Sequence, residues 1–140
     1  DALFSIPPNV YLIGLMNTAD RSLAMVDYAL RRRFAFMDLK PQFGSDKFSG
    51  YLESCGLDEA VINKVCSRML ALNEKIAGDN RDLGPGFCIG HSFFCSSRDG
   101  LNSEDWYQEI LENEIEPLLR EYWADNPDEA ENQLRALRDG

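Results

Sequence analysis

An uninterrupted apolar run is the first clear element in the pattern of hydrophobic and polar positions. Residues 10–16 are apolar without polar alternation, which is typical of a strand buried on both faces of a parallel sheet. The run stops at Asn17 and Thr18. Ligands of open α/β sheets bind at the carboxyl ends of the strands, so the pattern places these two polar side chains where a ligand would lie.

The next segment predicts a helix followed by a second strand. Asp20 can cap a helix over residues 21–33, and residues 34–39 predict a short strand. A strand, a crossover helix and a strand in one sheet form a right-handed β-α-β unit. Asp27 falls on the apolar stripe of this helix, where a carboxylate must be paired or face an interface. Two interpretations of Asp27 stay open. Its carboxylate forms an ion pair with Arg31, four residues later, or it faces an interface with a neighbouring molecule.

The remainder of the chain has the periodicity of a helical domain. Helices are predicted over residues 45–56, 58–78, 103–123 and 126–137. Their candidate N-caps are Ser45, Asp58, Ser103 and Asn126. Pro117 lies inside the third helix, and because proline cannot donate a backbone hydrogen bond, we expect a kink or a split there.

A Gly- and Ser-rich segment separates the second helix from the third, with an apolar insert at residues 87–95. The insert is too short for a helix between its flanking glycines, so the pattern predicts an extended segment or a small hairpin. It contains the single histidine of the chain, His91. Two roles are open for this side chain: structural packing against Phe93 and Phe94, or contact with a ligand.

The charge distribution excludes one class of function for these residues. The formal net charge of the 140 residues is −10, and from residue 103 onward twelve carboxylates accompany three arginines. Binding a nucleic-acid backbone requires a basic face, so we do not expect this part of the protein to bind one. The local basic spot consists of three consecutive arginines at residues 31–33.

Those three arginines have two interpretations. Their charges suit the negative end of a helix dipole. However, three consecutive residues point about 100° apart around a helix, so they cannot share one role. We expect at least one of them to face a partner, and we assign this to Arg33.

The cysteines and the apolar runs predict a cytoplasmic protein. Four cysteines without Cys-x-x-Cys spacing and a single histidine argue against a zinc site, and reduced thiols are expected. The apolar runs fall short of the ~20 residues that span a bilayer, and the sequence has no signal peptide. We therefore expect no contact with a membrane.

Two motifs together resemble those of a known family. The first combines Met-Asn-Thr-Ala-Asp-Arg-Ser at residues 16–22 with Asp-Tyr-Ala-Leu-Arg-Arg-Arg-Phe at residues 27–34. The second is Gly-Phe-Cys-Ile-Gly-His-Ser-Phe-Phe at residues 86–94. This combination resembles the McrB-type GTPases, which are the AAA+ motor subunits of modification-dependent restriction systems.

The resemblance implies a fold of the α/β plus α class, namely a truncated AAA+ P-loop NTPase module. Residues 1–42 would be the end of the α/β subdomain with its last β-α-β unit, and residues 43–140 the helical lid subdomain. The sequence has no Gly-x-x-x-x-Gly-Lys-[Ser/Thr] loop and no apolar strand ending in Asp-Glu. These are the Walker A and Walker B elements, which hold phosphate and metal. We therefore expect these residues to come from a longer chain and to be inactive alone.

The resemblance also implies catalytic residues. Asn17 matches the sensor-1 asparagine of the family, which would hydrogen-bond the attacking water or the γ-phosphate. Arg33 matches the arginine finger that reaches the nucleotide of a neighbouring subunit, and Arg32 resembles its companion. Asp27 matches an acid that faces the same neighbouring nucleotide.

The implied cofactor is GTP, or ATP, with Mg²⁺ in the full-length protein, and none in these residues alone. Asn17 and Thr18 would contact it from the strand tip, and His91 and Ser92 would lie near the sensor-2 region of the lid. The implied partners are further copies in a hexameric ring, an McrC-like nuclease subunit, and DNA carrying 5-methylcytosine, bound through a domain outside these residues.

Two other functions are compatible with the residues themselves. One is an ATP-using AAA+ chaperone of the MoxR kind, because nucleotide base specificity depends on residues outside this sequence. The other is a non-enzymatic helical interaction module that retains a vestigial strand.

Overall fold

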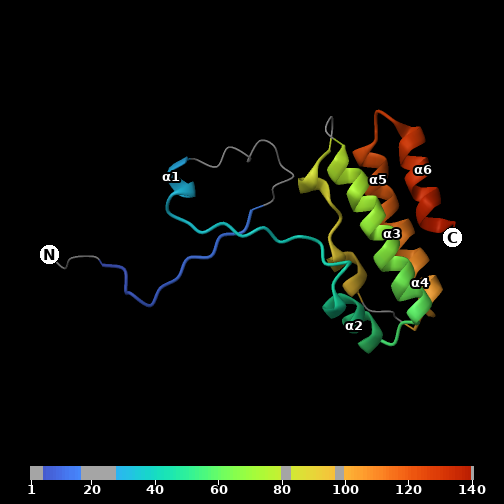
Figure 1. Ribbon diagram of the computed structural model, residues 1–140, viewed down its shortest axis with the longest axis horizontal. Coiled ribbons are helices and arrows are strands. Elements are labelled where there is room, and N and C mark those ends of the chain that lie inside the picture. The colour runs from blue at the N-terminus through green and yellow to red at the C-terminus, as the bar shows by residue number, and fades with distance from the viewer. Residues whose placement is uncertain (1–4, 17–27, 80–82, 97–99, 140) are drawn as a thin grey trace. The chain divides into compact units, whose positions relative to one another are not determined.

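The chain divides into two units, residues 1–35 and residues 36–140. The structure is a computed structural model that describes residues 5–16, 28–79, 83–96 and 100–139 (Figure 1). In the described part of the first unit the backbone forms the short helix α1 (Tyr28–Arg31). Two hydrogen bonds to the Leu30 carbonyl oxygen close its end, from the backbone N–H groups of Arg33 (3.0 Å) and Phe34 (3.1 Å).

The structure does not show the two predicted strands. Residues 10–16, like residues 34–39, contain no strand, and no strand is present elsewhere in the four described ranges. The apolar side chains of the first run are exposed; Ile13 and Leu15 each expose 89% of their surface. A strand is held by hydrogen bonds to a neighbouring strand, and the described residues provide no such neighbour. The β-α-β part of the predicted fold class is therefore not seen, and most of the predicted helix lies outside the described residues.

The second unit is helical, as its periodicity predicts. Its elements are α2 (Asp46–Ser54), α3 (Glu59–Gly78), η1 (Pro85–Phe87), η2 (His91–Cys95), α4 (Ser103–Ile110), η3 (Leu111–Ile115), α5 (Glu116–Tyr122) and α6 (Pro127–Arg138). Helix α3 contacts α2, α4 and α6, and α5 contacts α6. In this unit α3 is therefore the central helix around which the others pack (Figure 1).

All four predicted helices of this unit are confirmed, although one predicted cap is wrong by one residue. Ser45 caps α2 as expected, since its hydroxyl oxygen accepts the backbone N–H of Phe48 (3.3 Å). The cap of α4 is Asn102, whose side-chain oxygen accepts the N–H of Asp105 (2.9 Å). Ser103, the predicted cap, is buried, and its hydroxyl instead accepts the N–H of Asp58 (3.1 Å). It thereby connects the first turns of α3 and α4.

The core of the second unit combines the apolar stripes of its helices with aromatic rings from the connecting segments. Its largest fully buried side chains include Tyr107, Phe43, Phe94, Leu52, Met69 and Ile76. The hydroxyl of Tyr107 donates to the carbonyl oxygen of Leu137 (2.9 Å). Because a buried hydroxyl is costly without a partner, this bond both satisfies Tyr107 and attaches α4 to the last turn of α6.

Where the sequence predicts a kink or a split at Pro117, the structure has a π-helical turn just before that residue. Residues 111–115 form a π-helical turn, in which the N–H of Glu116 donates to the carbonyl of Leu111, five residues back. Proline has no N–H, and its ring clashes with the carbonyl four residues earlier in a regular α-helix, here that of Asn113. A wider turn relieves this clash, so the helix is widened rather than broken.

The apolar insert at residues 87–95 is not extended, and the predicted hairpin is wrong. It contains the end of η1 and the whole of η2, both 3₁₀ turns. The side chain of Asn73 in α3 holds the backbone between them: its oxygen accepts the N–H of Ile89 (2.7 Å), and its nitrogen donates to the Ile89 carbonyl (2.9 Å). The side-chain amide thus replaces the partner strand that a hairpin would have supplied.

Glu116 predicts a pH-dependent contribution to stability. Its carboxylate accepts hydrogen bonds from Arg120 (2.6 Å) and from Arg138. The bonds from Arg120 and the charge of Arg138 hold the pKa of this carboxyl below its ordinary value of 4.5. Because both arginines are partly exposed, Glu116→Gln should lower the free energy of unfolding at pH 7 by at most about 1 kcal/mol.

The sign of the pH dependence follows from the lowered pKa. The stabilisation is fully present above the pKa that Glu116 has in the unfolded protein. It is lost as the pH falls through the lower pKa of the folded protein. Urea unfolding of the unaltered protein and of the Glu116→Gln variant should be followed across this pH range. The difference between their free energies of unfolding should shrink to zero at low pH. Glu121→Gln, an exposed carboxyl on the same helix, is the matched control. A difference for Glu116→Gln that stayed constant at every pH would contradict the assignment.

Candidate functional site

The structure describes four of the seven residues that the sequence assigns to a nucleotide site. Asn17, Thr18 and Asp27 lie outside the described residues. Arg32 and Arg33 lie in the first unit, and the remaining two, His91 and Ser92, lie in the second.

Arg32 and Arg33 lie in the turn that follows α1, and both side chains are exposed. Arg31 is the last residue of that helix, where a positive charge interacts favourably with the helix dipole. The three arginines are therefore not equivalent, since the last two have left the helix. This position leaves the guanidinium of Arg33 accessible to another molecule.

His91 is fixed by contacts with a segment almost fifty residues earlier in the chain. Its Nδ1 accepts the backbone N–H of Gln42 (3.2 Å). The ring lies edge-on to Phe43 and Phe48, with ring centroids 6.4 and 5.5 Å apart. The packing partners are therefore Phe43 and Phe48, and the expectation that they would be Phe93 and Phe94 is wrong.

The hydrogen bond to His91 also indicates the tautomer of its neutral ring. A histidine nitrogen that accepts a hydrogen bond carries no proton, so the proton of the neutral ring is on Nε2. His91 thus combines a structural contact on one ring nitrogen with a hydrogen-bond donor on the other. Its two predicted roles are compatible with one another in this geometry.

His91 and Ser92 lie beside two different pockets. The first pocket, about 250 Å³, is bordered by His91 together with Ser45, Lys47 and Tyr51. Ser45, Lys47 and His91 offer hydroxyl, ammonium and imidazole N–H donors, which suit an anionic or hydrogen-bond-accepting group, whereas the Tyr51 hydroxyl donates to the Cys95 carbonyl oxygen (3.3 Å). Ser92 is exposed and borders a second pocket, next to Trp106.

Sequence reasoning did not find the residues that position His91. Gln42 acts through its backbone N–H, which any residue except proline would supply. Phe43 and Phe48 fit the apolar pattern of a core equally well. The sequence pattern thus carried no signal that these residues contact the histidine.

Taken together, a central helix, its flanking helices and a histidine-containing 3₁₀ segment form a helical domain. Residues 64–131 match the family described as McrB, alpha-helical lid domain. Over 126 residues the chain is 48% identical to the Type IV methyl-directed restriction enzyme EcoKMcrB subunit of Escherichia coli (strain K12). The chain is therefore of the McrB type. The match covers 89% of this chain and 28% of that relative, so the chain spans less than a third of the relative's length.

Proposed function

We propose that this chain is the C-terminal part of the AAA+ module of a GTP-hydrolysing motor subunit in a modification-dependent restriction system. The 48% identity to a restriction enzyme subunit over 126 residues carries the proposal. Those 126 residues exceed the 68 residues of the lid match at 64–131, so the similarity includes residues outside the lid. It favours neither a MoxR-like chaperone nor a non-enzymatic module.

The exposed apolar run at residues 10–16 supports a place in a larger sheet. Seven consecutive apolar residues, all but Gly14 with a side chain in solvent, mark a surface that another part of a protein covers. A parallel strand with helices on both faces would bury these side chains. In the proposal this run is the sensor-1 strand and residues 34–39 are the last strand of that sheet.

The proposed hydrolysis depends on positioning water and neutralising charge, because phosphoryl transfer needs little else from the protein. Asn17 hydrogen-bonds the attacking water or the γ-phosphate of its own subunit's nucleotide. Arg33 stabilises the charge that develops on the nucleotide of the adjacent subunit, with Arg32 and Asp27 beside it. The exposure of Arg33 fits this role, since a finger must extend away from its own chain.

In the lid, His91 and Ser92 contribute hydrogen bonds rather than charge. The neutral ring of His91 can donate from Nε2 to a phosphate or ribose oxygen, and Thr18 contacts the nucleotide from the strand tip. Mg²⁺ supplies charge neutralisation between the phosphate groups when bound. The Walker elements that would hold it are absent from this sequence.

The proposed assembly is a cytoplasmic hexameric ring with nucleotide between neighbouring subunits. An McrC-like nuclease subunit joins it, and a domain outside these residues binds DNA carrying 5-methylcytosine. The net charge of −10 supports placing DNA contact elsewhere. Of the helices that the structure describes, none is long and apolar enough to cross a bilayer.

Nucleotide turnover tests this proposal directly. A longer protein that carries this chain together with a Walker A loop should hydrolyse GTP at least about tenfold faster than ATP at equal concentration. The 140-residue chain alone should hydrolyse neither, because it lacks the phosphate-binding loop. Phosphate release measured for both proteins with both nucleotides checks this. A preference for ATP would favour the chaperone alternative, and turnover by the 140 residues alone would refute our account.

A further inference from the structure

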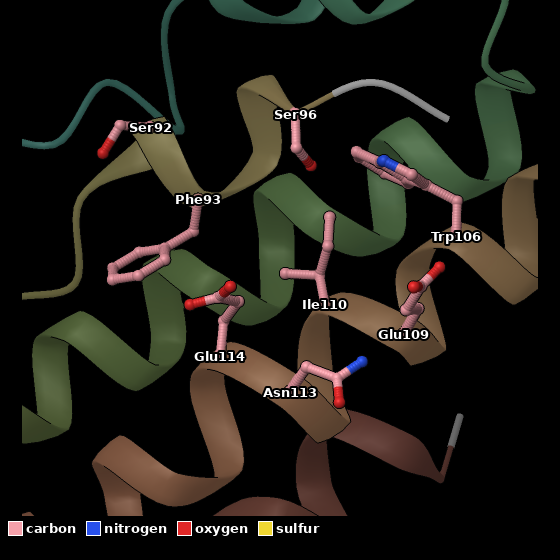
Figure 2. A pocket seen from close by; sticks show the side chains of 8 residues that line it. All are labelled: Ser92, Phe93, Ser96, Trp106, Glu109, Ile110, Asn113 and Glu114. Atoms are coloured by element: carbon pink, nitrogen blue, oxygen red, sulfur yellow. The ribbon is translucent and has the colours of Figure 1, made fainter. Parts of the chain in front are cut away.

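The second pocket of the lid has features that the proposed nucleotide site does not use. It has a volume of about 400 Å³ and lies between η2 and the helix formed by α4 and η3. Figure 2 shows Ile110 between Phe93 on one side and Trp106 on the other, with Glu109, Asn113 and Glu114 around the opening. The pocket thus combines an apolar wall with a polar rim.

Trp106, which lines this pocket, carries an unpaired buried donor. Its side chain is 2% exposed, and its indole Nε1 has no hydrogen-bond partner in the part of the chain that the structure describes. The ring lies edge-on to Phe94, with centroids 6.0 Å apart, so packing restricts its reorientation. Buried donors are almost always paired, and this one lies on a side chain that lines the pocket (Figure 2).

The rim of the pocket is acidic. Glu109 and Glu114 are exposed, and among the described residues no basic side chain forms an ion pair with either. The amide of Asn113 adds an acceptor and a donor beside them. Such a rim repels phosphate and attracts a cation, so the part of the pocket beside Glu109 and Glu114 favours a cation over the phosphate groups of a nucleotide or a nucleic acid.

We propose that this pocket binds an arginine residue of a partner protein. The planar guanidinium has several N–H donors that match two carboxylates and an amide oxygen, whereas a lysine ammonium is a point charge. The aliphatic stem of the arginine would pack on Ile110, and the charged group would lie near the ring of Phe93. A backbone carbonyl of the partner segment that carries this arginine would accept the N–H of Trp106. This requires a small adjustment of the side chains that cover the indole nitrogen.

The binding can be measured on the 140-residue chain by NMR. The probe is the peptide Gly-Arg-Gly, acetylated and amidated, and its matched control carries citrulline, the neutral isostere of arginine. The chain has two tryptophans, so Trp123→Phe identifies the indole N–H signal of Trp106. We expect the arginine peptide to shift that signal downfield in a saturable manner, and the citrulline and lysine peptides to bind at least about tenfold more weakly.

Charge variants locate the contact. Glu109→Gln and Glu114→Gln should each weaken binding of the arginine peptide several-fold, and together at least about tenfold. Glu112→Gln removes the same charge from the same stretch of helix at an exposed residue outside the pocket lining, and should change binding less than twofold. The proposal is overturned if the Trp106 signal does not move, if citrulline or lysine acts equally, or if Glu112→Gln weakens binding as much as the pocket variants. Because the measurement involves no nucleotide, its failure would leave the proposed GTPase function untouched.

Discussion

Replacing Arg33 with alanine should abolish GTP turnover by a longer protein that carries this chain, while leaving nucleotide binding largely unchanged. An arginine finger stabilises charge that develops in the transition state and contributes about 10³- to 10⁵-fold in rate. The side chain of Arg33 is exposed after the end of α1, which suits action on an adjacent subunit. Steady-state phosphate release, with nucleotide affinity measured separately, distinguishes the two effects.

Two controls make this result specific. Arg31→Ala removes the same charge from the last residue of α1 and should change turnover far less. If Arg33 acts on the neighbour's nucleotide, mixing Arg33→Ala subunits with Asn17→Ala subunits should restore part of the activity. An interface that combines the intact Asn17 of one subunit with the intact Arg33 of the other is then complete. An unchanged rate for Arg33→Ala would remove this residue from the site.

Phe94→Ala should be the most destabilising single change in the insert, lowering the free energy of unfolding by about 3–5 kcal/mol. The ring is 1% exposed. Its centroid lies 5.7 Å from that of Phe43, 6.0 Å from Trp106 and 6.4 Å from Tyr107. Removing it leaves a cavity where η2 meets α4, and the surrounding rings can collapse into it only in part.

Phe93→Ala is the matched control, because Phe93 is the adjacent residue of the same type and is only half-buried. Phe93→Ala should lower the free energy of unfolding by less than about half of the loss expected for Phe94→Ala. Urea unfolding followed by far-UV circular dichroism gives both values. Equal losses for the two variants would show that the insert does not anchor the core through Phe94.

Local sequence signals predicted the helices well where both ends are encoded nearby. Helix α2 lies between Ser45 and Gly56, and the positive φ of Gly56 (77°) matches its role as a stop signal. The cap of α4 was missed because Ser103 and Asn102 are both good capping residues. The choice between them depends on the hydrogen bond that Ser103 makes to Asp58, 45 residues away, which no local pattern contains.

The insert and the first unit show a second limit. Residues 87–95 have an apolar composition that suits a strand, yet the amide of Asn73 fixes Ile89 between two 3₁₀ turns. Residues 10–16 have a strand pattern but no neighbouring strand among the described residues. Strand formation depends on partners far away in sequence, whereas a helix forms its hydrogen bonds within one segment.

For the candidate site, the sequence identified the residue types but not their surroundings. The sequence placed Arg33 at the end of the predicted helix, whereas α1 ends at Arg31 and Arg33 lies exposed in the turn that follows; its role as an arginine finger stays a prediction. The environment of His91 could not be predicted, since it depends on the backbone of Gln42 and on two rings from α2 and the segment before it. The unpaired indole of Trp106 also gave no signal, because its periodicity is that of an ordinary core residue.

The π turn before Pro117 determines which face of α5 packs into the core. One additional residue per turn advances every later position by about 100° around the helix axis. Asn113 and Glu114 occupy that turn, while Leu119 beyond it is fully buried. A sequence shortened by one residue that regained a regular α-helix here would rotate α5 by about 100° and turn Leu119 away from the core. The burial of α5 is therefore encoded by helical phase as much as by residue type.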